Sequence, residues 1–246
     1  MLRNFTLHTE KDYDAMSQKA AEVFAKAVKA NPTGAFGFAT GSTPEGMYNN
    51  LVQMQSTGKV DLTGIIAFNL DEYYPIKPDD PQSYYYYMRQ KLFDKLGLDA
   101  ASTFIPDGQA KDPKAECAAY DEKIAKAGGI DTQILGIGNN GHIGFNEPDQ
   151  NLQATTNLVA LAEDTIESNA RFFSSPEDVP RHAISMGMHT ILMAKRILLL
   201  ATGEGKAKIL QEALWGPITT MVPASLLQLH HHVTIIVDQA AAKYLK

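Results

Sequence analysis

The chain has 246 residues, 44% hydrophobic and 20% charged, a globular composition with enough length for one large domain or two small ones. Its formal net charge is −6 and its Lys and Arg residues form no dense cluster, which argues against nucleic-acid binding because that requires a basic face. No apolar run approaches the ~18 residues of a membrane helix, and the first residues do not have the apolar core of a signal peptide, so we expect a cytoplasmic protein without a membrane span. Cys117 is the only cysteine, so we expect neither an internal disulfide nor a four-cysteine zinc site.

Short apolar runs alternate along the chain with longer amphipathic segments. Residues 1–34 read as one long helix before the first strand. The apolar runs predict strands at Ala35–Thr40, Ile65–Asp71, Thr132–Gly138, Arg196–Thr202 and Val233–Asp238. Apolar residues at three- and four-residue spacing predict helices at Tyr13–Lys29, Pro44–Gln55, Tyr84–Leu96, Lys114–Lys126, His189–Lys195 and Lys206–Leu214. Such alternation favours a mostly parallel sheet covered by helices, and with no linker or repeat we expect a single α/β domain over residues 1–246.

The segment Ala39–Pro44 lies between a predicted strand and a predicted helix. Pro44 suits the first helical position, and Ser42 or Thr43 suits the N-cap. Gly41 lets the backbone approach a ligand, and the free N–H groups of the helix start can hold a phosphate. Simple helix capping explains the same residues.

Two adjacent acids, Asp71 and Glu72, follow the second predicted strand. If the strand continues, their side chains point in opposite directions, so one of them can face a cleft as a proton acceptor. Alone, the pair is better explained as a structural carboxylate at a turn. The tyrosine run at 84–87 is typical of packing, with at most one hydroxyl in a site.

The glycine-rich segment from Leu135 to Pro148 is the most distinctive. Its glycines require a loop whose backbone closely approaches another group. Within the loop, His142 can exchange a proton with a sugar oxygen, and a carboxylate such as Glu147 can fix its tautomer. A purely structural loop histidine is the alternative.

Residues 151–181 are polar and weakly periodic, and we expect them to form a mobile helical flap. Arg171 in this flap, and Lys206 after the fourth predicted strand, are candidate phosphate ligands, although each can equally be a plain surface cation. The run His230–His232 suggests a metal site, but neighbours on a strand alternate faces and no acidic or cysteine partner stands at ligand spacing. We expect no metal there, and a loop rim or a subunit contact instead.

Taken together and in this order, the segments TGSTP, FNLDEY, SYYYYM, GHIGFNEP, NARFF and PASLLQLH resemble the glucosamine-6-phosphate deaminase family from Ala35 to about His230. The resemblance implies a three-layer α/β/α Rossmann-like fold, no cofactor, and glucosamine 6-phosphate as the substrate, converted to fructose 6-phosphate and ammonia. It implies Asp71 as the base that moves a proton between C2 and C1, and His142, tuned by Glu147, as the group that opens the sugar ring. It further implies a phosphate site formed by Gly41, Ser42, Thr43, Arg171 and Lys206.

The chain departs from the family pattern at two places. Asn140 stands where many members have aspartate; its amide oxygen can orient His142, and we expect a shifted pH optimum. Asn157 and Val159 stand where allosteric hexamers have a basic pair, so we expect unregulated, hyperbolic kinetics and a monomer or small homo-oligomer.

Three other functions remain open. A 6-phosphogluconolactonase needs no proton transfer between C1 and C2, so Asp71 would have no catalytic role in it. A galactosamine-6-phosphate enzyme acts on a substrate that differs at one hydroxyl, and nothing in the sequence indicates which of the two substrates is bound. A sugar-phosphate sensor normally lacks the acid–base residues.

Overall fold

The computed structural model describes residues 5–170, 173, 175 and 178–245. Within them, seven strands form a parallel sheet in the order β1-β10-β9-β6-β2-β3-β5. The bounds are β1 Phe5–Glu10, β2 Ala35–Phe38, β3 Ile66–Asn69, β5 Thr103–Phe104, β6 Thr132–Leu135, β9 Arg196–Ala201 and β10 Val233–Asp238. Both β2 and β6 are buried at every position, as expected for central strands covered on both faces.

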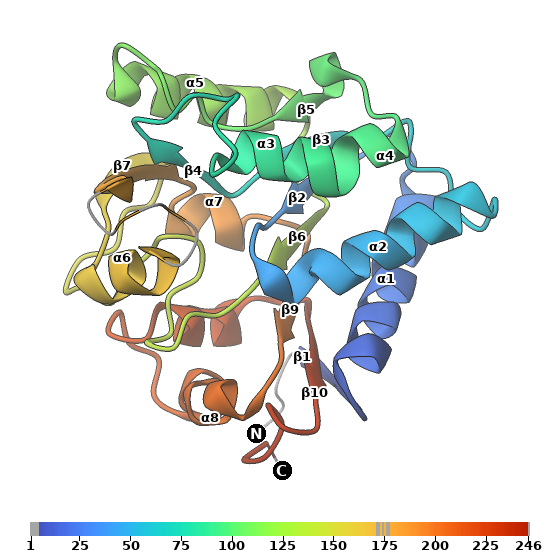
Figure 1. The fold of residues 1–246 in the computed structure, drawn as a ribbon. Helices are drawn as coiled ribbons and strands as arrows, with labels where there is room; N and C mark the ends of the chain where they lie inside the picture. Colours follow the sequence, from blue (N-terminus) through green and yellow to red (C-terminus); the bar gives the residue numbers. More distant parts are fainter. Residues whose placement is uncertain (1–4, 171–172, 174, 176–177, 246) are drawn as a thin grey trace.

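Helices cover the two faces of this sheet. Their bounds are α1 Tyr13–Ala30, α2 Ser42–Ser56, α3 Tyr84–Met88, α4 Asp94–Leu96, α5 Pro113–Lys126, α6 Glu163–Ala170, α7 Met188–Leu192 and α8 Ala207–Trp215. A π-helical turn, η1 Arg89–Phe93, joins α3 to α4, and the 3-10 turns are η2 Ala100–Ser102, η4 Glu204–Lys206 and η5 Pro223–Leu229. Figure 1 shows α1 and α2 on one side of the sheet and α7 and α8 on the other.

The register explains which side chains meet which layer. Phe36 and Phe38 on β2 point the same way, and the ring of Phe24 on α1 lies 5.2 Å and 5.5 Å from theirs. Phe68 on β3 is paired with Gly37, so it points to the opposite face, where its ring lies 5.9 Å from that of Tyr120 on α5. The predicted three-layer α/β class is confirmed. The predicted strands and the predicted helices from Tyr13 onward are present with changes at their ends, and a π-helical turn interrupts the helix predicted at Tyr84–Leu96.

The amino-terminal segment corrects the prediction of one long helix over residues 1–34. Phe5–Glu10 forms the edge strand β1, parallel to β10, and the helix begins only at Tyr13. Phe5 and Leu7 pack against the core while Thr6 between them is exposed. This short segment becomes a strand because β10 supplies the hydrogen bonds.

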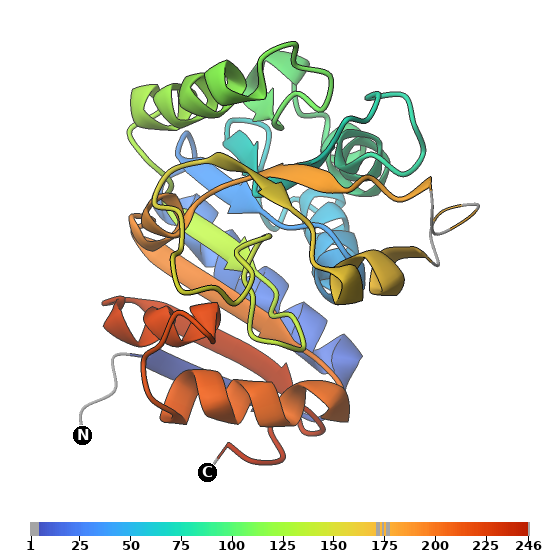
Figure 2. The same ribbon diagram turned by 90° about the vertical axis from the view of Figure 1, so that its left-hand side faces the viewer.

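A second sheet of three antiparallel strands has the order β4-β8-β7, with bounds β4 Asp71–Tyr74, β7 Asn157–Ala160 and β8 His182–Ser185. It lies on the side of the large sheet opposite α1 and α2 in Figure 1, and faces the viewer in Figure 2. The predicted strand Ile65–Asp71 is therefore wrong at its end. The Leu70 N–H donates to Phe38 O in the large sheet at 2.9 Å, whereas Leu70 O accepts from Met186 N beside the small sheet at 2.9 Å. Asp71 thus begins a new strand.

The expected flap, residues 151–181, contains more regular structure than its composition predicts. It supplies β7 to the small sheet and the helix α6. Three of its buried residues, Leu161, Ile166 and Val179, form a second hydrophobic cluster, separate from the main core, with Tyr73, Ile76, Phe145 and Ala183. Val159, Ala170 and Phe173 of the same segment pack against this cluster. This cluster attaches the segment to β4 and to the glycine-rich loop.

Among the described residues, no helix is long and apolar enough to cross a membrane.

Candidate active site

The glycine-rich loop after β6 meets the start of β4. Asp71 is 6% exposed and is paired with Ser185 across the small sheet. A Cβ atom built on Gly144 would lie 3.7 Å from Asp71 Oδ2 and 3.2 Å from Ser185 Oγ, and the φ of Gly144 is +56°. The left-handed φ favours glycine at position 144, and the loop there runs within van der Waals distance of the Asp71 carboxylate.

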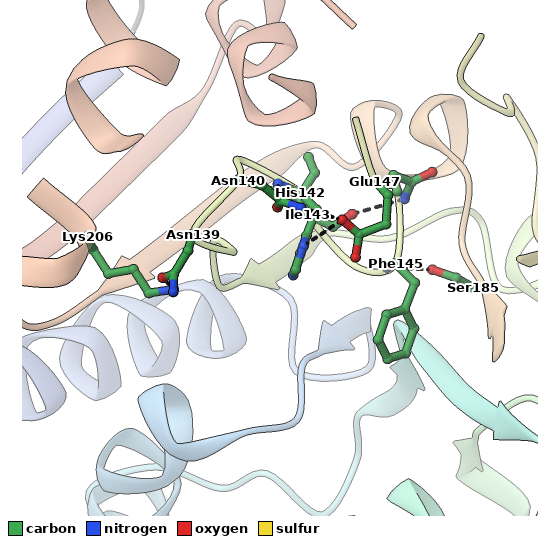
Figure 3. A network of polar contacts seen from close by, with 9 residues as sticks. Asn139, Asn140, His142, Ile143, Phe145, Glu147, Ser185 and Lys206 are labelled. Carbon is green, nitrogen blue, oxygen red and sulfur yellow. Dashed lines mark hydrogen bonds and ion pairs between the residues drawn. The ribbon is translucent and has the colours of Figure 1, made fainter. Parts of the chain in front are cut away.

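His142 and Glu147 point toward each other across the loop (Figure 3). His142 Nδ1 lies 3.1 Å from Glu147 Oε2. Because a carboxylate only accepts hydrogen bonds, the proton sits on Nδ1 and Nε2 is left to exchange a proton with a ligand. The imidazole lies flat against the loop, since a Cβ built on Gly138 would be 2.3 Å from His142 Cε1.

Asn140 completes this group through Glu147. Its Nδ2 donates to the same Glu147 Oε2 at 2.7 Å, and its Oδ1 accepts from the backbone N–H of His142 at 3.2 Å. The amide oxygen of Asn140 thus contacts His142 at its backbone rather than at its ring. The amide orients the carboxylate, which in turn binds the ring.

Two further side chains, Asn146 and Ser185, hold the loop in place. The buried Asn146 amide donates to Ile143 O at 3.0 Å and to Met186 O at 2.8 Å. The backbone N–H of Phe145 donates to Ser185 Oγ at 3.1 Å. Asn146 lies inside the recognisable GFNEP segment, but nothing in the sequence indicates that its partner is the end of β8, 40 residues away.

The two adjacent acids point in opposite directions, as their alternation predicts. Asp71 faces the loop, whereas Glu72 accepts backbone N–H groups from the start of α3. Burial, and then the neighbouring Glu72 carboxylate, raise the pKa of Asp71 to about 8. A carboxylate with so raised a pKa in a protein interior is suited to accept a proton from carbon near neutral pH.

The phosphate-loop candidates lie at the start of α2. The N-cap is Gly41, with φ of +105°, and the helix begins at Ser42, so the expectation of Pro44 as the first helical residue with Ser42 or Thr43 as the cap is wrong. No side-chain hydrogen bond caps this helix, so its first N–H groups remain available to an anion. Tyr13 and Tyr87 donate their hydroxyls to Ser42 O at 2.9 Å and Gly41 O at 2.7 Å, which anchors the turn.

Lys206 reaches the glycine-rich loop from η4, where Nζ donates to Asn139 Oδ1 at 2.6 Å (Figure 3). Burial lowers the pKa of Lys206 from its usual value. The structure thus brings Lys206 next to the loop that carries His142. Arg171 lies outside the described residues.

The tyrosine run is divided between packing and the site. Tyr84 is stacked on Phe145 with ring centroids 6.2 Å apart and an interplanar angle of 8°. Tyr85 and Tyr86 are 39% and 38% exposed.

His230, the first residue of the run His230–His232, has a structural role. The His232 N–H donates to His230 Nδ1 at 3.1 Å, so His230 Nε2 carries the proton and donates to Ala194 O at 2.7 Å. In the described part of the chain, no three His, Cys, Asp or Glu side chains are grouped to hold a metal ion.

A buried carboxylate, a carboxylate-bound histidine and an uncapped helix start, gathered where the strands of a parallel sheet end, define an α/β enzyme of acid–base type. A family described as glucosamine-6-phosphate isomerases/6-phosphogluconolactonase matches residues 9–236. The chain belongs to this family, and the resemblance to the deaminases within it is confirmed by the relatives.

These relatives cover nearly the whole chain. A glucosamine-6-phosphate deaminase of Halothermothrix orenii is 55% identical over 96% of this chain and 98% of its own length, and one of Clostridioides difficile is 50% identical over 96% and 94%. The solved structure of a monomeric glucosamine-6-phosphate deaminase superposes with a TM-score of 0.94 at 42% identity, over 97% of this chain and 99% of that one. A 6-phosphogluconolactonase of Trypanosoma brucei, with a TM-score of 0.80 at 18% identity over all of both chains, shares the fold.

Proposed function

We propose that this protein is a glucosamine-6-phosphate deaminase, which converts glucosamine 6-phosphate and water to fructose 6-phosphate and ammonia in the cytoplasmic breakdown of amino sugars. The observation that carries the proposal is the approach of the His142 loop to Asp71, marked by the 3.7 Å between Asp71 Oδ2 and a Cβ built on Gly144. It brings a base and the loop that carries a separate acid–base group next to each other. Relatives at 50% identity or more that carry this name support the same activity.

The reaction begins with ring opening. His142 Nε2 takes the proton of the C1 hydroxyl and delivers it to the ring oxygen as the bond between C1 and that oxygen breaks, while Nδ1 stays bound to Glu147, whose position Asn140 fixes. The product is the open-chain 2-amino aldehyde.

Asp71 then moves one proton between two carbons. It removes the proton from C2 while O1 gains a proton, which leaves an enolamine. It then returns the first proton to C1 while the amino group loses one, which gives the 2-imino sugar. Water adds to C2 of the imine and ammonia leaves, so that fructose 6-phosphate is formed with no change in overall oxidation state. Burial suits this step, since a base with a pKa of about 8 both accepts a proton from carbon and releases it again.

The phosphate is bound at the start of α2 in this proposal. Gly41, Ser42 and Thr43 offer free N–H groups and hydroxyls, and Lys206 and Arg171 supply positive charge. A fixed phosphate lowers the barrier by holding C1 and C2 beside Asp71.

We also infer hyperbolic kinetics and a monomer or small homo-oligomer. Val159 packs against the second hydrophobic cluster, and neither it nor Asn157 carries a charge for an anionic effector. The similar solved structure is described as monomeric.

The test is the release of ammonia and fructose 6-phosphate from glucosamine 6-phosphate by the parent and by Asp71→Asn. Stoichiometric release by the parent and its loss in a folded Asp71→Asn protein support the proposal. Galactosamine 6-phosphate and 6-phosphogluconolactone serve as comparison substrates. Turnover of the lactone alone by the parent would contradict the proposal.

A further inference from the structure

Glu72 is a buried acid that the proposed reaction does not use. It is 2% exposed and lies on the face of β4 opposite Asp71. Its carboxylate accepts three backbone hydrogen bonds, from Tyr73 N at 2.9 Å and Tyr84 N at 2.8 Å on Oε1, and from Tyr85 N at 2.8 Å on Oε2. Both oxygens are therefore bound to the main chain.

Two of these donors belong to the start of the helical segment 84–96. The first N–H groups of a helix have no partner inside it, and a carboxylate is a favourable partner because the helix start is positive. Ser83 caps the same helix from its own end by accepting from Tyr86 N at 3.0 Å. Glu72 differs from Ser83 because it ties the helix to β4, the strand that carries Asp71.

Tyr84, the first residue of α3, lies where several parts of the site meet. Its ring centroid is 4.7 Å from that of Tyr73, and its ring is stacked on Phe145 of the His142 loop. Burial, and then the neighbouring Tyr73 and Asp71, raise the pKa of its hydroxyl, which is also close to Thr40 before the phosphate loop. The place of Tyr84 therefore depends on how α3 starts.

We propose that Glu72 is a positioning residue of the deaminase reaction, whose carboxylate fixes the start of α3 to β4 and so holds Tyr84 between Asp71, the His142 loop and the phosphate loop. This inference rests on the proposed function.

The charge of Glu72 also acts on Asp71. Burial raises the pKa of Glu72 to about 7 against the opposing effect of its three N–H donors, and Asp80 raises it further. The charged groups that share the cavity of about 640 Å³ beside Glu72 are Asp79, Arg89, Asp94 and Asp107. The Glu72 carboxylate in turn raises the pKa of Asp71, so loss of its charge makes Asp71 ionise at lower pH.

The experiment compares Glu72→Gln and Ser83→Ala with the parent. Glu72→Gln keeps the size of the side chain, removes the charge, and turns an NH2 group toward Tyr85 N–H or Tyr84 N–H. We expect kcat to fall roughly ten- to a hundredfold, because a displacement on the order of 1 Å is enough for such a loss. We expect KM to change less, and the acidic limb of the kcat/KM profile to move to lower pH.

Ser83→Ala is the matched control, because it weakens the same helix start without touching Glu72. We expect Ser83→Ala to lower the melting temperature, to leave the acidic limb of the kcat/KM profile where it is in the parent, and to change kcat by no more than about twofold. Equal kinetic effects of the two substitutions, or a Glu72→Gln profile that follows the parent, would overturn the positioning role.

The activity of the parent protein tests the proposed function separately from the role of Glu72. If the parent releases no ammonia from glucosamine 6-phosphate, the proposed function fails. If the parent does so and Glu72→Gln matches it in kcat and pH profile at a lower melting temperature, only the role of Glu72 fails.

Discussion

Asn140 donates a hydrogen bond of 2.7 Å to the oxygen of Glu147 that also binds His142. An aspartate at position 140 would bring a second carboxylate within the same distance of Glu147, and two carboxylates so close share a proton or repel each other. The amide instead donates to Glu147 and adds no second negative charge beside it.

Asn140→Asp is expected to leave an active enzyme with a pH optimum displaced upward. The added negative charge favours the protonated form of the imidazole, so the acid–base cycle of His142 shifts to higher pH. Full pH–rate profiles measure the displacement. Asn139→Asp is the control, since it adds the same charge one residue away, beside Lys206, and should act mainly on KM. An unchanged optimum in Asn140→Asp would refute the interpretation.

Asp71→Asn is expected to be inactive and yet more stable than the parent at neutral and alkaline pH. Between the ordinary pKa of 3.8 and about 8, the folded protein binds a proton at Asp71 that the unfolded chain has released. Rising pH therefore opposes folding of the parent, by at most about 1.4 kcal/mol per pH unit from this group. The asparagine variant lacks this effect.

Thermal melting from pH 4 to pH 9 measures the difference. The gap in melting temperature between Asp71→Asn and the parent should widen up to about pH 8, the pKa of Asp71, and then stay constant. Asp61→Asn, at a fully exposed aspartate whose pKa is lowered by Thr63, should show no such widening. A constant gap over the whole range would argue against a buried, neutral Asp71.

Gly138→Ala is expected to lose activity by displacing the imidazole of His142. The added methyl group would lie 2.3 Å from His142 Cε1, so the ring must move away from its present place. A loss in kcat of roughly a hundredfold is expected from a shift on the order of 1 Å. Gly136→Ala is the matched control, because a Cβ there has nothing within 4 Å. Similar rates for the two variants would show that the ring tolerates the shift.

Lys206→Gln is expected to raise KM for the sugar phosphate with a smaller effect on kcat. Loss of a charge-assisted hydrogen bond to phosphate weakens binding by roughly ten- to a hundredfold. Competitive inhibition by inorganic phosphate should weaken in parallel, which provides a readout independent of the chemical step. Lys208→Gln, two residues on with an 83% exposed side chain, should match the parent in both measurements. Unaltered inhibition by phosphate in Lys206→Gln would remove Lys206 from the site.

Local sequence patterns were sufficient to place most of the helices and strands. The spacing of apolar residues in α1 and the continuous apolar run of β9 depend on neighbours within a few positions, so their type and approximate bounds are readable without the fold. The same is true of the loop around His142, because glycine density and a motif of eight residues are local features. The sequence thus determined the fold class, the family resemblance and the choice of Asp71, His142 and Glu147 as candidate site residues.

The tertiary structure decided the contacts between distant segments. β1 has little strand signal of its own and forms because β10 lies beside it. Glu72 meets an N–H group 12 residues along the chain, and Lys206 reaches an amide 67 residues back. Such partners are set by sheet register and by the packing of layers, where a shift of one residue turns a side chain to the other face. For this reason the sequence named the chemical groups of the site, and only the folded chain determined which of them touch.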